Sequence, residues 1–336
     1  MTETNHPTHL SPSELGTKDY WETFYARTLA HLSQKQTQSQ STDRTDTNDA
    51  QDGRKGDDEE DDDDEEDVDD DSDPGTSWFS EYNAPDKVLR FLTGEEFPLA
   101  PVNTKVDTTG GKGGEQPSIL DLGTGNGSML ALLRKRGHFR GEMVGVDYSR
   151  ASVELARRLQ VLRAHDAYLT DSEDEGEGDD GEEEEKEIRF EEWDILRAEG
   201  WALADADNGG GRPRVDWFPY SRGGFDIVLD KGTFDAVSLS EEVVEDAERK
   251  DGTGKTVQRR VCETYPGIAR RTVRKGGFLV VTSCNWTEEE LVQWFTRETA
   301  GDEDRLVVWG RVEYPRFRFG GREGQGVVTV CFQRVD

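Results

Sequence analysis

A turn rich in glycine is the part of this sequence whose residue types and spacing point most directly to chemistry. It follows Asp121 by two residues and consists of Gly123, Thr124, Gly125, Asn126 and Gly127. Glycines let backbone amides approach a ligand closely, and a helix starting there adds its own N-terminal amides. A dinucleotide-binding turn has glycine at its sixth position, which is Ser128 here. With no Lys or Arg beside it, the turn suits a zwitterion, such as the methionine end of S-adenosyl-L-methionine, better than a pyrophosphate, and Asp121 is the candidate to lie near the ammonium.

Four further residues, in two pairs, extend this predicted cofactor site. Asp147 ends the next apolar run, where a carboxylate accepts both hydroxyls of a ribose, and Tyr148 follows it. Capping of the next helix is a compatible second role for Asp147. Asp194 follows a third run and is predicted to accept from the adenine amino group while Trp193 packs on the ring. The alternative for Asp194 is a simple cap at the end of a strand.

Two other strand ends carry candidate residues for the reacting groups. Asp230 and Lys231 precede Gly232, and we predict that Asp230 contacts the cofactor or orients the reacting groups. The alternative is a surface ion pair, which contributes only about 0–1 kcal/mol. Asn285 and Trp286 follow the fifth strand and are predicted to shape the entrance for the acceptor.

Aromatic residues near the N-terminus have two interpretations. Trp78 and Phe79 either cover the cofactor as a lid or pack a helix onto the domain, and the sequence favours neither. For Trp21 and Tyr25 we predict packing, because they lie at helical spacing in residues 15–32.

These residues need elements that bring them together, and the apolar pattern supplies alternating strands and helices. The predicted strands cover residues 118–122, 142–147, 188–193, 225–230 and 277–283. The predicted helices cover residues 86–92, 128–136, 149–164, 261–274 and 287–299, the last capped by Thr287 with Glu290. Residues 307–319 and 327–334 have no helix between them and predict an antiparallel hairpin around Gly320 and Gly321.

Alternating strands and helices predict an α/β fold with ligands at the carboxyl ends of the strands. We therefore expect a Rossmann-like, doubly wound, mostly parallel seven-stranded sheet with a C-terminal antiparallel hairpin. Such a terminal hairpin is typical of the seven-strand methyltransferases.

The acidity of the chain is concentrated in two segments. Residues 43–73 carry nineteen Asp and Glu against three Lys and Arg, and residues 166–187 carry thirteen against one. Such runs cannot bury apolar surface, so we expect them to be disordered linkers. The expected organisation is a disordered N-terminus at 1–14, a helix at 15–32 that packs on the catalytic domain, and an acidic linker at 33–75. A methyltransferase domain then covers 76–336, with a disordered insert at 166–187.

Composition excludes several other classes. Three widely spaced cysteines, with no CxxC pair, argue against disulfides and zinc, so no metal is expected. No apolar run approaches the length of a membrane span, and no signal peptide is visible, so we expect a cytoplasmic protein without membrane contact. No basic face for direct binding of nucleic acid is apparent, and we expect a monomer.

Longer motifs resemble one family specifically. The sequences at 230–239 (DKGTFDAVSL), 282–287 (TSCNWT) and 317–322 (FRFGGR), with the opening at 15–25 (LGTKDYWETFY), are similar to the eukaryotic elongation factor 1-alpha lysine methyltransferases. Ser80 departs from the glycine usual in that family, and long acidic inserts replace short loops. The resemblance implies methyl transfer from S-adenosyl-L-methionine to a lysine of translation elongation factor 1-alpha. The lysine must be neutral to react, and Asp230 is the candidate that orients it.

Three alternatives share part of this evidence. A methyltransferase for another protein or a small molecule has the same cofactor residues, and only the acceptor-side motifs argue against it. A non-catalytic protein that binds S-adenosylmethionine would be expected to have a damaged glycine turn, which is intact here. A nicotinamide dehydrogenase is disfavoured by Ser128 and by the terminal hairpin.

Overall fold

The computed structural model describes most of the domain that the sequence predicts. The described residues are 7–42, 79, 82–104, 116–168, 186–197, 214–250, 256–297, 304–319 and 322–336. Segment 43–73, most of 166–187, and Trp78 lie outside these ranges, so the expected disorder of the acidic segments stays a prediction.

A seven-stranded sheet forms the centre of the molecule, in the order β3-β2-β1-β4-β7-β11-β8. The first five strands in this order pair in parallel, and β11 pairs antiparallel with both β7 and β8. The sheet thus confirms the predicted fold class. The strands are β1 Ile119–Leu122, β2 Met143–Asp147, β3 Arg189–Glu192, β4 Phe225–Lys231, β7 Val273–Ser283, β8 Arg305–Val312 and β11 Val328–Val335.

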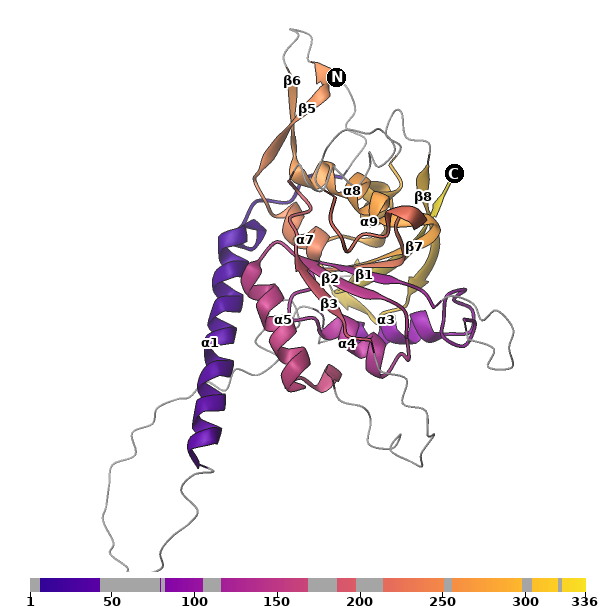
Figure 1. The fold of residues 1–336 in the computed structure, drawn as a ribbon. Coiled ribbons are helices and arrows are strands. Elements are labelled where there is room, and N and C mark those ends of the chain that lie inside the picture. Colours follow the sequence, from indigo (N-terminus) through magenta and orange to yellow (C-terminus); the bar gives the residue numbers. More distant parts are fainter. Residues whose placement is uncertain are drawn as a thin grey trace, which may run out of the picture.

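Helices cover both faces of this sheet because its central strands are apolar on both sides. On β4, Val228 faces the cluster that contains α7, α8 and α9, while Ile227 and Leu229 face the cluster that contains α1, α3, α4 and α5. Figure 1 shows α1 running beside α5 at one margin of the molecule. The helices are α1 Lys18–Thr42, α3 Ala84–Thr93, α4 Ser128–Lys135, α5 Arg150–Leu162, α7 Thr233–Ser238, α8 Tyr265–Thr272 and α9 Glu288–Phe295.

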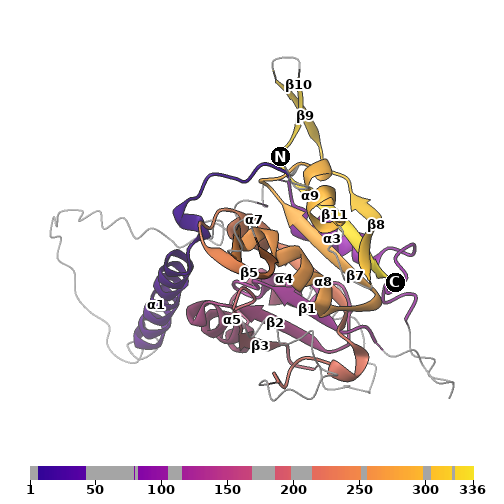
Figure 2. The ribbon, with the colours of Figure 1, turned by 90° about the horizontal axis from the view of Figure 1, so that it is seen from above.

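The predicted C-terminal antiparallel hairpin is confirmed, but its arms are not continuous strands. Its two long arms are divided, so that β8 and β11 join the main sheet while β9 Arg316–Phe319 and β10 Arg322–Gln325 pair separately. Figure 2 shows this ribbon standing out from the body of the domain. Pro315 lies at the division, where its missing amide hydrogen cannot take part in a strand ladder.

A second two-stranded ribbon was not predicted. It consists of β5 Val243–Lys250 and β6 Thr256–Arg260, which pair antiparallel. The charged sequence of β5 has no alternating pattern, so only its pairing with β6 makes it a strand. The predicted helix at 261–274 is also shorter: a 3₁₀ turn η6, Val261–Glu263, precedes α8, and Val273 already pairs with Phe225 as part of β7.

The N-terminal region corrects two expected boundaries. The first helix extends to Thr42 instead of residue 32, through a sequence without Gly or Pro. Residues 7–14 were expected to be disordered, but they lie against the domain. The Arg260 guanidinium donates to the Leu10 carbonyl over 2.7 Å, and the Ser13 amide donates to the Leu239 carbonyl over 3.1 Å. Long-range bonds of this kind leave no pattern in the local sequence.

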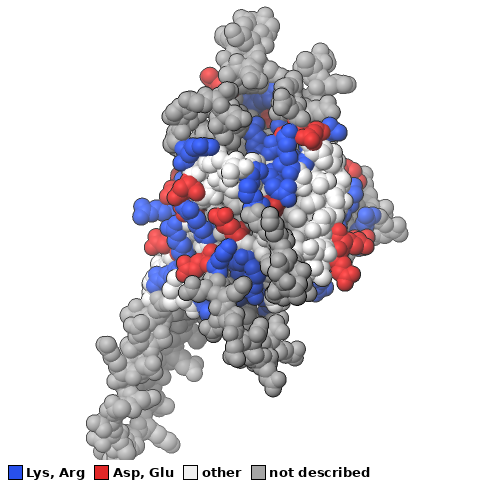
Figure 3. All heavy atoms as spheres, turned by 45° about the vertical axis from the view of Figure 1, so that its right-hand side comes forward, with Lys and Arg blue, Asp and Glu red and all other residues white. Residues whose placement is uncertain are grey.

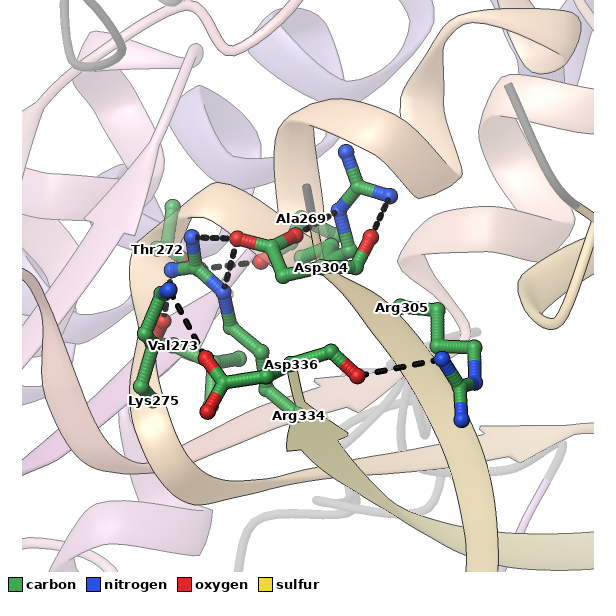
Figure 4. A network of polar contacts seen from close by, with 9 residues as sticks. Ala269, Thr272, Val273, Lys275, Asp304, Arg305, Arg334 and Asp336 are labelled. Carbon is green, nitrogen blue, oxygen red and sulfur yellow. Dashed lines mark hydrogen bonds and ion pairs between the residues drawn. The ribbon is translucent and has the colours of Figure 1, made fainter. Parts of the chain in front are cut away.

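The C-terminus is fixed by a network of charges at the end of the sheet opposite the strands' carboxyl ends (Figure 4). Asp304 forms ion pairs with Arg270, at 3.0 Å, and with Arg334. Lys275 binds the Asp336 carboxylate over 2.8 Å, and Arg305 donates to the Asp336 carbonyl over 3.0 Å. These bonds hold α8, β7, β8 and β11 together.

Basic side chains gather on the upper part of one face of the molecule (Figure 3), although the chain carries a formal net charge of −32. Most of the negative charge belongs to segments 43–73 and 166–187. Among the helices of the described ranges, none combines the length and the apolar character needed to cross a membrane.

Candidate active site

A cleft opens at the carboxyl ends of β1, β2 and β4, where the topology predicts a ligand site. Its volume is about 960 Å³, including the space that is open to solvent. The walls come from the glycine turn, the ends of β2, β3 and β4, and the N-terminal part of the chain. The lining residues are Gly16, Trp21, Tyr25, Phe79, Leu122, Gly123, Thr124, Gly125, Asn126, Val146, Asp147, Tyr148, Trp193, Asp194, Ile195, Leu196, Lys231, Gly232, Thr233, Ala236 and Val237.

The glycine turn forms one wall of the cleft and requires its glycines. Gly123, Gly125 and Gly127 have φ angles of 62°, 57° and 76°, a region that L side chains rarely adopt. A Cβ atom on Gly123 would lie 2.2 Å from Thr233 Oγ1, and one on Gly127 would lie 2.7 Å from the Phe190 ring. Gly127 precedes α4, so the first amides of that helix point towards the turn.

Asp121 lies beneath this turn and is not itself a lining residue of the cleft. Its Oδ2 accepts from Thr124 Oγ1 over 2.9 Å. Burial raises the pKa of Asp121 to about 6, against the hydrogen bond from Thr124 and the positive charge of Lys231. The predicted contact with the methionine ammonium would therefore act through Thr124 or through water.

Asp147 stands at the end of β2 and lines the cleft as predicted. Its Oδ2 accepts from the Gly125 amide over 3.1 Å, and its Oδ1 accepts from the Ser149 amide over 2.9 Å. Burial raises the pKa of Asp147. Tyr148 also lines the cleft, and its hydroxyl donates to the Thr17 carbonyl over 3.3 Å.

Trp193 and Asp194 line the cleft next to the end of β2, together with Ile195 and Leu196. The Trp193 amide donates to the Asp147 carbonyl over 2.8 Å, which joins this wall to β2. Asp194 Oδ1 accepts from the Leu196 amide over 3.1 Å, and its Oδ2 lies 3.1 Å from Arg197 Nε. The wall therefore offers one carboxylate amid apolar surface.

Asp230 is not among the residues that line the cleft, so its predicted contact with the cofactor or the reacting groups stays a prediction. Its side chain is 1% exposed. Oδ1 accepts from the amides of Thr233 and Phe234 over 3.0 and 3.1 Å, and Oδ2 accepts from the Tyr265 hydroxyl over 2.7 Å. The carboxylate thus holds the first turn of α7, where three donors occupy it.

Of the neighbours Asp230 and Lys231, only Lys231 lines the cleft. Its Nζ lies 5.1 Å from the centroid of the Phe79 ring, within the range of a cation–π contact. Phe79 is fully buried and also packs on Gly232, where a Cβ atom would lie 2.9 Å from the ring. Phe79 therefore both lines the cleft and packs against Ala84, Tyr314 and Val327, while its role as a lid over the cofactor stays a prediction.

Asn285 and Trp286 are not among the residues that line the cleft, so their role at the acceptor entrance stays a prediction. Trp286 is a buried core residue that stacks on Phe234, and its Nε1 donates to Ser238 Oγ over 3.2 Å. Asn285 is exposed at the surface, and its amide donates to Ser283 Oγ over 3.2 Å. The predicted capping box of Thr287 and Glu290 at α9 is confirmed.

The structure adds cleft residues from α1 and the turn before it. Trp21 and Tyr25 were predicted to pack, and they do, but both also line the cleft beside Gly16. The Tyr25 hydroxyl lies 2.8 Å from the position that a Cβ on Gly125 would take. No sequence signal could join these residues to a turn about a hundred positions later.

The arrangement suits a nucleoside with a zwitterionic tail. Carboxylates at Asp147 and Asp194 face the cleft from one side, Lys231 contributes a positive charge near the glycine turn, and apolar walls lie between them. Within the described ranges, no three His, Cys, Asp or Glu side chains form a group that could hold a metal ion.

Comparisons with known proteins agree with this arrangement. Residues 115–171, which include β1, the glycine turn and β2, match a family model described as a methyltransferase domain. Protein-lysine N-methyltransferase EFM4 of Saccharomyces cerevisiae is 30% identical over 324 residues, which is 96% of this chain and 96% of that protein. EEF1A lysine methyltransferase 2 is 26% identical in Danio rerio, over 97% of this chain and 90% of the relative. The Homo sapiens protein of that name is 24% identical, over 96% and 88%.

Among solved structures, a SAM dependent methyltransferase from Aquifex aeolicus aligns with a TM-score of 0.40 and 14% identity, over 79% of this chain and 94% of that one. The N-methyltransferase NodS from Bradyrhizobium japonicum aligns with a TM-score of 0.38 and 11% identity, over 79% and 99%. The sequence relatives, which span nearly the whole chain, carry the assignment. Because of its 30% identity to EFM4 over almost the full length of both proteins, this chain belongs to the family of protein-lysine N-methyltransferases that includes EFM4 and EEF1A lysine methyltransferase 2.

Proposed function

We propose that this protein transfers a methyl group from S-adenosyl-L-methionine to a lysine side chain of translation elongation factor 1-alpha. The observation that carries the proposal is the near-full-length match to relatives named for this substrate, in a chain whose glycine turn and Asp147 line one cleft. We further propose that it acts as a monomer in the cytoplasm, where the elongation factor works.

The cleft residues fit the cofactor by the chemistry of their donors and acceptors. Asp147 would accept from the ribose hydroxyls, and Asp194 from the adenine amino group between the apolar side chains of Trp193 and Ile195. The turn from Gly123 to Gly127 would hold the methionine part. When bound, S-adenosylmethionine supplies a methyl group on a positively charged sulfur.

The chain's own part in the reaction is to position the groups and to keep the acceptor amine neutral. A lysine side chain has an ordinary pKa near 10.4, and desolvation by apolar walls lowers it. Phe79, Trp21 and Tyr25 supply such walls, and the positive charge of Lys231 acts in the same direction by disfavouring a second ammonium. Because Asp230 is occupied by α7, we assign no side chain as a base. Most of the acceleration would come from holding the amine in line with the methyl group.

The test incubates the purified protein with labelled S-adenosylmethionine and recombinant elongation factor 1-alpha, followed by peptide mapping of the label. We expect label on a lysine of the factor. Gly123→Arg abolishes it, because the side chain would collide with Thr233 at the glycine turn. Gly223→Arg is the matched control: its φ is also positive, at 70°, but no described atom lies within 4 Å of its Cβ position. Label on a small molecule, and none on the factor, would overturn the proposal.

A further inference from the structure

Glu22 of α1 joins the N-terminal helix to the start of α5, two residues after the cleft residue Asp147, by direct hydrogen bonds. Its Oε2 accepts from Ser149 Oγ over 2.7 Å and from the Ala151 amide over 3.4 Å. Both donors belong to the start of α5, where unpaired amides and the helix dipole favour a carboxylate. Glu22 is therefore held at the N-terminus of a helix that is far from it in sequence.

Ser149 links Glu22 to Asp147 by hydrogen bonds to both. Besides donating to Glu22, Ser149 caps α5, because its Oγ accepts from the Ser152 amide over 3.1 Å. Its own amide donates to Asp147 Oδ1 over 2.9 Å. Asp147 Oδ2 then accepts from the Gly125 amide, and Ser152 Oγ donates to the Gly125 carbonyl over 2.8 Å. An unbroken chain of bonds thus runs from Glu22 to the carboxylate at the cleft and to the glycine turn.

The residues that flank Glu22 on α1 lie in the wall of the same cleft. Trp21 and Tyr25 line it on either side of Glu22 in sequence. Trp21 Nε1 donates to the Leu15 carbonyl over 2.8 Å, and this fixes the turn that carries Gly16. A Cβ on Gly16 would lie 2.2 Å from the Leu239 backbone, so the turn is seated tightly against the end of α7. The N-terminal segment is therefore anchored on both sides of the cleft.

We propose that Glu22 is a positioning residue of the cofactor site, which acts through Ser149 to fix the Asp147 carboxylate in the orientation that receives the ribose hydroxyls. This inference rests on the proposed use of S-adenosylmethionine. It makes the cofactor site bipartite: α1 supplies Glu22 and part of the wall, and the β1–β4 region supplies the groups that bind.

A purely structural role for Glu22 predicts a different result from a positioning role. If Glu22 only attached α1 to α5, its loss would weaken every ligand of the cleft alike. If it orients Asp147, its loss removes affinity only for ligands that carry ribose hydroxyls. The comparison of two ligands that differ only in these hydroxyls therefore separates the two roles.

The experiment measures by calorimetry the binding of S-adenosylhomocysteine and of its 2′,3′-dideoxy analogue to the full chain. We expect Glu22→Leu to weaken the binding of S-adenosylhomocysteine about tenfold, which is the effect of one lost hydrogen bond to a charged group. The binding of the dideoxy analogue should weaken less than twofold. Glu22→Gln keeps an acceptor oxygen for Ser149 and should restore most of the affinity. Glu154→Leu, at an exposed position of α5, is the matched control and should leave both affinities unchanged.

Two further variants keep the test decisive if Glu22→Leu folds poorly. Ser149→Ala removes the hydroxyl that links Glu22 to α5 and should reproduce the selective loss. In an Asp147→Asn background, Glu22→Leu should cause no additional loss. An equal loss for both ligands, or none, would overturn the positioning role. Failure of the unmodified protein to bind S-adenosylhomocysteine would instead overturn the proposed cofactor.

Discussion

Gly123→Ala tests the contact between the glycine turn and α7. The φ angle of 62° costs a residue with a Cβ about 1–2 kcal/mol. The added Cβ would lie 2.2 Å from Thr233 Oγ1, and this oxygen donates to the Leu122 carbonyl over 2.6 Å. Thr233 must therefore turn away and lose its hydrogen bond, which costs about a further 1 kcal/mol. We expect Gly123→Ala to reduce the free energy of unfolding by about 2–3 kcal/mol.

Gly223→Ala supplies the matched control, because it carries the backbone cost without the collision. Its φ angle is 70°, and no described atom lies within 4 Å of the added Cβ. We expect Gly223→Ala to reduce the free energy of unfolding by only about 1–2 kcal/mol and to leave cofactor affinity unchanged. Urea denaturation followed by tryptophan fluorescence measures both variants, and S-adenosylhomocysteine binding is measured beside it.

A third variant identifies Thr233 as the source of the difference. Thr233→Ala removes the oxygen and the methyl carbon that the new Cβ would meet at 2.2 and 3.0 Å. The double variant Gly123→Ala/Thr233→Ala should therefore lose about 1 kcal/mol less free energy of unfolding than the losses of the two single variants added together. Equal costs for Gly123→Ala and Gly223→Ala, together with simple additivity in the double variant, would refute this explanation of the glycine turn.

Three other predictions concern the buried polar groups. Asp147→Asn should weaken S-adenosylhomocysteine about tenfold or more, by removing a charged acceptor, as measured by equilibrium dialysis; unchanged affinity would remove Asp147 from the site. Burial raises the pKa of Asp230 to about 7 from 3.8, so the folded state keeps a proton that the unfolded state has released. The stability that Asp230 contributes is thus present below pH 4 and lost as the pH rises towards 7. The free energy of unfolding of the natural protein, minus that of Asp230→Asn, should fall between pH 4 and 7 in urea titrations, and a constant difference would contradict it. Trp286→Phe should cost about 1–2 kcal/mol of stability, because Ser238 Oγ loses its bond, while S-adenosylhomocysteine binding stays the same; a selective loss of binding would return Trp286 to the site.

Local sequence determined the architecture because the signals that encode it are short in range. Glycines at alternate positions after an apolar strand specify a turn with positive φ angles, and Asp147 at the end of the next strand falls on the same edge of a parallel sheet. The apolar pattern gave the central strands and most helices within a few residues. That pattern did not predict the ribbon β5–β6, because pairing and not local pattern makes β5 a strand. It did predict the C-terminal hairpin, but not the division of its arms into β8–β11 and β9–β10.

The tertiary structure decided which polar side chains face the cleft. Asp230 and Lys231 are neighbours at one strand end, but consecutive residues of a strand point to opposite faces. Asp230 is satisfied by the amides of α7 and the Tyr265 hydroxyl, and Lys231 extends to the cleft beside Phe79. Which donors surround a carboxylate depends on elements far away in the chain, so the sequence did not separate the two roles.

The sequence by itself indicated the class of enzyme, through the turn at Gly123–Gly127, the carboxylate at Asp147 and the longer motifs that resemble one methyltransferase family. Only the tertiary structure decided that Trp21 and Tyr25 line the cleft and that Glu22 accepts a hydrogen bond from Ser149. Their helix reaches the cleft by docking on α5 and on the glycine turn, across about a hundred residues of chain. Contacts over such separations are fixed by packing and hydrogen bonding in the folded domain, and no local pattern of residues encodes them.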